Sequence, residues 1–223
     1  MGKNKTPGSK IPKIFAALFT LFMLHGFSYA DFIDSLMSPE TIPEPNLGFN
    51  ELNLKAGYDY SSYFESVNAI GSDGRTVFNS GHSPSFALEY LRYINVYIAA
   101  GAGIGAQVPR SLEYFPGKFG FVPAYLALKV RSWPQEPGMF GYVVGHLGYN
   151  NFYADSDFEK EFKAKKGGVY YGGGFGISYN SFLFEFIYSI SNCEIEDAAS
   201  KTAIGLTYRI WTFSVGYNFG DLF

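Results

Sequence analysis

Residues 94–107 read INVYIAAGAGIGAQ, and an apolar side chain occupies every even position of this stretch. The even residues are Ile94, Val96, Ile98, Ala100, Ala102, Ile104 and Ala106. The odd residues include Gly101, Gly103, Gly105 and Gln107. Because successive side chains of an extended chain point to opposite faces, this alternation predicts a β-strand with one apolar face and one face of small or polar residues.

The same alternation recurs along most of the chain. We expect strands at about 52–61, 86–90, 94–107, 122–131, 139–150, 169–179, 182–191 and 204–219. In 139–150 two facings compete, and we place the odd residues outward because this turns His146 and Asn150 inward. Long connections, the last of them the acidic stretch 194–197, alternate with short turns around 92–93, 132–137 and 180–181. This rhythm is typical of bacterial outer-membrane barrels, which have long extracellular loops and short periplasmic turns.

The last predicted strand changes the face that carries its apolar residues. Ile204, Leu206 and Tyr208 are even, whereas Trp211 and Phe213 are odd. Two strands here would give nine, but bacterial single-chain barrels have an even number. We therefore expect one long strand with a β-bulge near residues 209–210, because one extra residue reverses the facing. A ten-stranded barrel, with an additional strand from residues 31–50, is the alternative.

The amino end has the three parts of a secretory signal peptide. Four lysines precede the apolar run Ile14 to Leu24, and Ser28-Tyr29-Ala30 fits a cleavage site before Asp31. The predicted organisation is a signal peptide at 1–30, a periplasmic lead-in at 31–50 and a barrel at 51–223. Removing the four lysines changes the net charge from −3 to −3 − 4 = −7, which argues against nucleic acid as a partner. The single cysteine, Cys193, excludes an internal disulfide and any multi-cysteine metal site.

The size of the side chains on the apolar faces decides which side of the sheet meets lipid. The interior of an eight-stranded barrel is just wide enough to be filled by side chains. The face that carries Phe182, Phe184, Phe186 and Phe213 is too bulky for it, whereas the opposite face is rich in Gly, Ala and Ser. A soluble sandwich would expose the glycine-rich faces and leave edge strands to protect. We therefore predict an all-β, closed antiparallel transmembrane β-barrel, most simply of eight strands, in the bacterial outer membrane.

Aromatic residues near the strand ends are expected at the two membrane interfaces. On the periplasmic side these are Tyr90, Tyr93, Trp133, Tyr179 and Phe219, and on the outer side Tyr58, Tyr60, Tyr171 and Trp211.

The chain resembles the small outer-membrane β-barrels of the OmpA and OmpX type. The resemblance rests on the signal peptide, the alternation of short turns and long loops, the glycine-rich run 171–176 and the closing strand 211–219. That strand is similar to the aromatic-terminated strand by which the outer-membrane insertion machinery recognises such proteins, although Gly220 to Phe223 extends beyond it. The resemblance implies the fold and the location, with outer-membrane lipid, lipopolysaccharide and the insertion machinery as partners.

Three motifs with catalytic or ligand-binding associations are better explained structurally. Gly101-x-Gly103-x-x-Ala106 matches a loose dinucleotide fingerprint, but a strand pattern rather than a helix follows it. His82-Ser83 with Glu89 suggests a lipid-deacylating hydrolase, yet neighbouring strand residues point to opposite faces. Asp155-x-Asp157-x-Glu159 lacks the glycine and the closing glutamate of a calcium loop. We expect no catalytic residue, cofactor or metal.

Four predicted inward charges form the candidate site: Lys55, Glu89, Lys129 and Glu185. A charge in a narrow lumen is costly unless it is paired, so we expect an internal network of ion pairs and water. The network is either a structural filling of the lumen or a gate for small ions. The expected function is a structural or surface-interaction role through extracellular loops, without catalysis. A narrow ion or small-solute pore and a lipid-modifying enzyme are the alternatives, and the ligand of the loops stays open.

Overall fold

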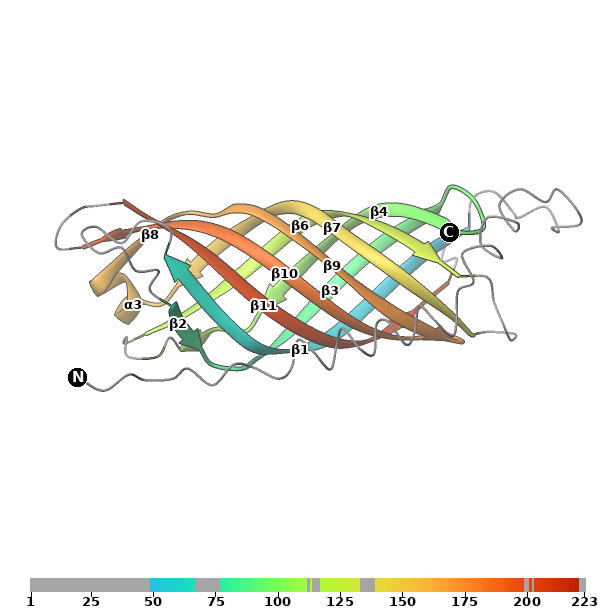
Figure 1. The fold of residues 1–223 in the computed structure, drawn as a ribbon, viewed down its shortest axis with the longest axis horizontal. Coiled ribbons are helices and arrows are strands. Elements are labelled where there is room, and N and C mark those ends of the chain that lie inside the picture. The colour runs from blue at the N-terminus through green and yellow to red at the C-terminus, as the bar shows by residue number, and fades with distance from the viewer. Residues whose placement is uncertain are drawn as a thin grey trace, which may run out of the picture. The chain divides into compact units, whose positions relative to one another are not determined.

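The computed structural model describes residues 49–66, 77–111, 113, 117–132, 139–198, 201 and 203–220. The predicted signal peptide and nearly all of the predicted lead-in lie outside these residues. Eight long strands form a closed antiparallel barrel (Figure 1). They are β1 (Asn50–Ser66), β3 (Ser83–Tyr93), β4 (Ile98–Gln107), β6 (Lys118–Arg131), β7 (Met139–Ala154), β9 (Gly168–Tyr179), β10 (Phe182–Asp197) and β11 (Ala203–Asn218).

Each of the eight strands pairs with the next along the chain, and β11 pairs with β1 to close the ring. The closing register runs from Asn53 opposite Asn218 to Ser66 opposite Leu206, so the first and last strands lie side by side along the wall. Because β1 already has β3 and β11 as its two neighbours, the ring has no place for a further strand. The predicted eight-stranded barrel is confirmed, and the ten-stranded alternative is excluded.

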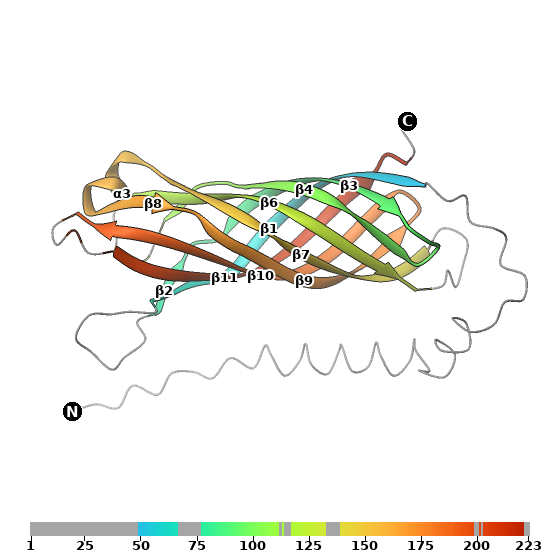
Figure 2. The same ribbon diagram turned by 90° about the horizontal axis from the view of Figure 1, so that it is seen from above.

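Short additional elements extend the barrel at the end where Ser66 of β1 pairs with Leu206 of β11. They are β2 (Val77–Ser80), which pairs with β1, β5 (Arg110–Ser111), which pairs with β6, and β8 (Phe162–Lys166), which pairs with β10. The helix α3 (Ser156–Glu161) precedes β8, and Figure 2 shows α3, β8 and β2 at the same end of the barrel. In the part of the chain that the structure describes, no helix has the length and apolar character needed to cross a membrane.

Two predicted connections differ from those observed. The first short turn lies at residues 94–97 rather than around 92–93, so Tyr93 is still in β3 and its side chain is buried in the lumen. The prediction that Tyr93 lies at the periplasmic membrane interface is therefore wrong. The acidic residues 194–197 belong to β10 rather than to a loop. The turn at Asn180-Ser181 is observed as predicted, with Asn180 at a φ of 52°.

An apolar belt surrounds the barrel. Its exposed side chains include Leu54, Phe86, Leu88, Ile104, Leu126, Leu128, Val143, Leu147, Val169, Ile177, Phe184, Phe213 and Val215. Along β11 and the residue that follows it, the belt runs from Trp211 to Phe219, nine residues, and a transmembrane strand needs about 9–11. Outward-facing charges lie at its edges, with Arg92 at the turn end of β3 and a Glu65–Arg209 ion pair at the other end. The belt is the lipid-facing surface of a transmembrane β-barrel.

Several strands are longer than the belt requires. β1 has 17 residues, and β7, β10 and β11 have 16 each, so their ends extend past the membrane into water. Inside this extension the lumen holds a buried apolar cluster, which we call the outer plug: Phe64, Phe119, Phe121, Phe158, Cys193, Ile195, Leu206, Tyr208 and Ile210. The apolar side of the wall therefore changes from outside to inside where the surroundings change from lipid to water.

This change of surroundings explains the altered pattern in the last strand. The register between β10 and β11 is continuous from Phe182–Tyr217 to Glu196–Ala203, without a bulge at residues 209–210. Even residues of β11 point inward along its whole length, so Leu206 and Tyr208 enter the outer plug while Phe213 faces lipid. The prediction of one long strand is confirmed. The predicted bulge, and the outward facing of Ile204, Leu206 and Tyr208, are wrong.

The wall does contain an irregularity, in β1. Tyr60 is opposite Trp211 and Tyr63 is opposite Arg209, so β1 has one more residue than β11 in this interval. The bulge reverses the facing of β1 and turns Phe64 into the outer plug, where it is 2% exposed. The apolar residue after the bulge, Phe64, is even like Leu54 and Tyr58 before it, so the apolar positions show no change of phase.

A charge placed on the belt tests its contact with lipid. Leu126 is 68% exposed on β6, an environment in which a water-soluble protein would tolerate lysine. In a bilayer we expect Leu126→Lys to lower the free energy of unfolding by about 2–4 kcal/mol, depending on its depth. Ala203→Lys, at an exposed position of β11 outside the belt, is the matched control. Urea unfolding in lipid vesicles measures both, and equal stability of the two variants would contradict the position of the belt.

Candidate functional site

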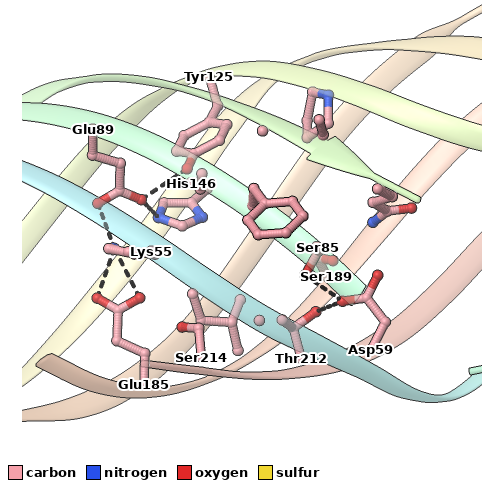
Figure 3. A pocket seen from close by; sticks show the side chains of 18 of the residues that line it. Lys55, Asp59, Ser85, Glu89, Tyr125, His146, Glu185, Ser189, Thr212 and Ser214 are labelled. Carbon is pink, nitrogen blue, oxygen red and sulfur yellow. Dashed lines mark hydrogen bonds and ion pairs between the residues drawn. The ribbon is translucent and has the colours of Figure 1, made fainter. Parts of the chain in front are cut away.

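Three of the four predicted inward charges meet at the centre of the lumen. Lys55 on β1 lies between Glu89 on β3 and Glu185 on β10 (Figure 3). Its Nζ is 2.5 Å from Glu89 Oε2 and 2.7 Å from Glu185 Oε1. All three side chains are at most 4% exposed. The strand period directs them inward, and the closed wall brings residues 130 positions apart into contact.

Aromatic side chains complete this central cluster. The Tyr125 hydroxyl donates to Glu89 over 2.8 Å, and the Tyr142 hydroxyl donates to Glu185 over 2.9 Å. His146 Nε2 is 3.3 Å from Glu89 Oε1, and its ring stacks on Tyr125 with centroids 4.3 Å apart. The inward facing predicted for His146 is observed.

A glycine makes room for these groups. A Cβ on Gly103 would lie 2.7 Å from the Tyr125 ring and 2.8 Å from Glu89 Cγ. The small residues on the inward faces therefore determine where the large polar side chains fit.

The fourth predicted charge belongs to a separate pair near the turn end. Lys129 Nζ is 2.8 Å from Glu51 Oε2, and the Tyr93 hydroxyl donates to the same carboxylate over 2.7 Å. Lys129 Nζ also lies 4.2 Å from the centroid of the Tyr142 ring. Sequence reasoning missed Glu51, because it precedes the first residue assigned to the predicted strand.

A third ionic group lies just below the outer plug. Arg110 Nη2 is 2.6 Å from Asp59 Oδ2, and both side chains are fully buried. Arg110 also donates to the Tyr208 hydroxyl over 2.7 Å, which joins the ion pair to the plug. Asp59 occupies an inward position of the predicted first strand and could have been found from that pattern. Arg110 could not, because it lies in a predicted loop and is placed by the two-residue strand β5.

A cavity of about 70 Å³ separates the central cluster from the Asp59–Arg110 pair. Hydroxyl groups and charged groups line it together, from Ser85, Ser189, Thr212 and Ser214 to Asp59, Glu89 and His146 (Figure 3). A cavity of this size has room for a few water molecules, and these hydroxyl and charged groups are their hydrogen-bond partners.

The outer plug closes the lumen beyond the Asp59–Arg110 pair. Phe119 is fully buried, and its ring centroid lies 4.9 Å from Phe64 and 6.1 Å from Phe158. Phe158 comes from α3, so the helix contributes directly to the plug. Asp155 caps this helix by accepting a hydrogen bond from the Phe158 backbone N–H, which holds the pKa of its carboxyl below the ordinary value.

The other sequence motifs have structural roles. Asp157 pairs with Lys160 on α3, and the described residues contain no group of three or more His, Cys, Asp or Glu side chains that could hold a metal ion. His82 is exposed and stacks on Tyr58, whereas Ser83 is buried and donates to the Val108 carbonyl. The structure therefore does not bring His82, Ser83 and Glu89 together. The run 101–106 lies within β4.

The predicted interfacial aromatics mostly face outward. Tyr58, Tyr90, Tyr171, Tyr179 and Phe219 are each 43–55% exposed. Tyr60 and Trp211 are partly buried and both contact Phe186. Trp133 lies outside the described residues.

The closed wall, the lipid-facing belt and the polar lumen together define the class of protein. The fold is that of the small eight-stranded outer-membrane β-barrels. Outer membrane protein AlkL, solved in DMPC lipid bilayers, superposes with a TM-score of 0.50 at 15% identity, over 83% of this chain and 99% of that chain.

Two further solved structures are similar over most of their length. Ail, the attachment invasion locus protein of Yersinia pestis, has a TM-score of 0.45 at 14% identity, over 77% of this chain and 99% of its own. Neisserial surface protein A has a TM-score of 0.44 at 12% identity, over 74% of this chain and 96% of its own. At such identities the likeness concerns the fold alone. No protein-family model matches the chain, and no curated protein matches it in sequence.

Proposed function

We propose that this protein is an integral outer-membrane barrel that neither conducts solutes nor catalyses a reaction, and that its role is exercised by the extension above the membrane. The observation that carries this proposal is the filling of the lumen. Lys129 and Glu51 occupy the turn end, the Lys55 cluster the centre, and the outer plug the far end.

Buried side chains occupy the described lumen at the turn end, at the centre and at the far end. The central ionic groups are at most 4% exposed, and Phe119, Phe121 and Tyr208 in the plug are fully buried. A structural filling, one of the two roles expected for the inward charges, is therefore favoured over a gate. Protein interiors packed in this way are rigid, and rigid scaffolds commonly carry recognition on their loops.

The extension supplies the surface for that recognition. The helix α3 and strand β8 are anchored to the wall through Phe158 and through the pairing of β8 with β10. The proposed route to this location is signal-peptide-directed export followed by assembly through the outer-membrane insertion machinery. Outer-membrane lipid and lipopolysaccharide are the proposed partners of the belt and its edges.

Recordings across planar lipid bilayers test the absence of conduction. We expect no stepwise current from the reconstituted full-length barrel at any applied voltage, because the ionic clusters and the plug lie in series. Glu89→Ala is expected to remain silent as well, since the outer plug stays closed. Discrete current steps from the unmodified protein would overturn the proposal in favour of a pore.

A further inference from the structure

Of the three ion-pair groups in the lumen, two have equal numbers of carboxylates and cations, and a further cation, Arg131, lies over the Tyr93 and Phe140 rings at the turn end. Lys129 faces one carboxylate, Glu51, and Arg110 faces one carboxylate, Asp59. Lys55 faces two, Glu89 and Glu185. The central cluster therefore carries one negative charge more than it has cations.

An uncompensated charge at this position is costly. Lys55, Glu89 and Glu185 are buried in the membrane-spanning part of the barrel, where a charge without a partner is strongly destabilising. Sharing a proton between the two carboxylates does not fit the geometry, because each of them is directed at Lys55 and they lie on opposite sides of it (Figure 3). A cation close to these carboxylates would therefore compensate the charge.

His146 is positioned to supply that charge. It extends from β7, and the groups that face it are Glu89 from β3, Tyr125 from β6 and Tyr170 from β9, with Lys55 and Glu185 beyond Glu89. Its side chain is 3% exposed, and neither ring nitrogen has a well-formed hydrogen bond, although Nε2 lies 3.3 Å from Glu89 Oε1.

The tyrosines cannot take this role. Tyr125 and Tyr142 donate their hydroxyl protons to Glu89 and Glu185, so they remain neutral.

We propose that the lumen is a binding site for one proton, held by His146 as an imidazolium against Glu89. The imidazole takes the proton from hydronium of the buffered solvent, which leaves water, and Nε2–H then points at the carboxylate while Nδ1–H is left for a water molecule in the adjoining cavity. The four groups Lys55, Glu89, Glu185 and His146 then sum to zero charge. The proton is part of the folded structure, as a structural cation would be.

Nitrogen NMR of the full-length barrel, labelled with ¹⁵N-histidine and folded in detergent micelles, tests this directly. At pH 7.5 we expect both ring nitrogens of His146 to carry protons. In Glu185→Gln, which removes the surplus carboxylate, we expect the number of protonated ring nitrogens to fall from two to one at the same pH. Glu194→Gln, on the outward face of β10, is the matched control and should leave His146 unchanged.

Each result decides the proposal. A neutral His146 in the unmodified protein overturns it, and so does an imidazolium that persists in Glu185→Gln, because the surplus carboxylate would then not be its cause. If Glu185→Gln does not fold, Glu89→Gln removes the same charge and takes its place. The measurement on the unmodified protein decides between the two charge states without any variant.

Discussion

Replacing Lys55 with methionine is expected to lower the free energy of unfolding of the barrel by about 3–5 kcal/mol. The substitution keeps the length of the side chain but leaves Glu89 and Glu185 without their shared cation. Both carboxylates are at most 3% exposed, so water cannot replace the ammonium group. Urea unfolding in lipid vesicles, followed by tryptophan fluorescence, measures the loss.

Two further variants separate the charge from the packing. The triple variant Lys55→Met, Glu89→Gln, Glu185→Gln removes the ionic cluster altogether and is expected to recover most of the lost stability, since the buried charges are gone. Lys160→Met removes an exposed ion pair with Asp157 on α3 and should leave stability unchanged. A Lys55→Met barrel as stable as the unmodified protein would show that the cluster is not desolvated as described.

Replacing Phe119 with alanine is expected to cost about 3–5 kcal/mol of folding free energy. The ring is fully buried in the outer plug and lies against Phe64, Phe121, Phe152, Phe158 and Tyr208. No lipid reaches this part of the lumen, so the cavity left by the ring stays unfilled. The same unfolding measurement reports the loss.

The lipid-facing Phe213→Ala is the matched control. Phe213 is 47% exposed on the belt of the same barrel. There an acyl chain takes the place of the missing ring, and we expect a much smaller loss than for Phe119→Ala. Equal losses for the two variants would contradict the assignment of Phe119 to a solid core and of Phe213 to the lipid surface.

The facing of most wall residues was predictable, because contact with lipid requires apolar side chains on the outer face and so produces a simple alternation in the sequence. In β6 the residues Ala124, Leu126 and Leu128 face outward while Tyr125, Ala127 and Lys129 face inward, as their alternation predicts. The same holds for β7, where His146 and Asn150 point inward. Within the bilayer the outer surroundings are uniformly apolar, so the pattern of one strand already tells which face meets lipid.

Facing cannot be predicted from this alternation where the strands leave the membrane. In β11 the apolar face changes at Arg209 because the surroundings change, not because the strand does. In β1 the bulge reverses the facing of the side chains at the point where the surroundings change from lipid to water. The two effects cancel, so Phe64 keeps the even position of the apolar residues before it. An apolar residue indicates an outward side chain where the wall is in lipid and an inward side chain where it is in water. The sequence of a single strand therefore cannot tell a change of facing from a change of surroundings.

Four charged residues of the candidate site were predictable from the sequence, but the ion pairs that they form were not. Lys55, Glu89, Lys129 and Glu185 were recognisable because each lies opposite the apolar face of a predicted strand. Their division into a cluster of three and a pair with Glu51 depends on which strands are neighbours and at what register. Arg110 has no strand pattern at all, since only pairing of β5 with β6 directs it into the lumen.

The amino-acid sequence by itself determined that the chain folds as a closed antiparallel barrel, which residues of its membrane part face lipid, and four of the charges that lie inside. These follow from a period of two and from the side-chain bulk that a narrow interior can accept. Only the tertiary structure decided where the membrane part ends, what closes the lumen and which charges neutralise one another. Those properties depend on contacts between residues far apart in the chain, such as Lys55 with Glu185 and Phe64 with Tyr208, which exist only once the wall has closed.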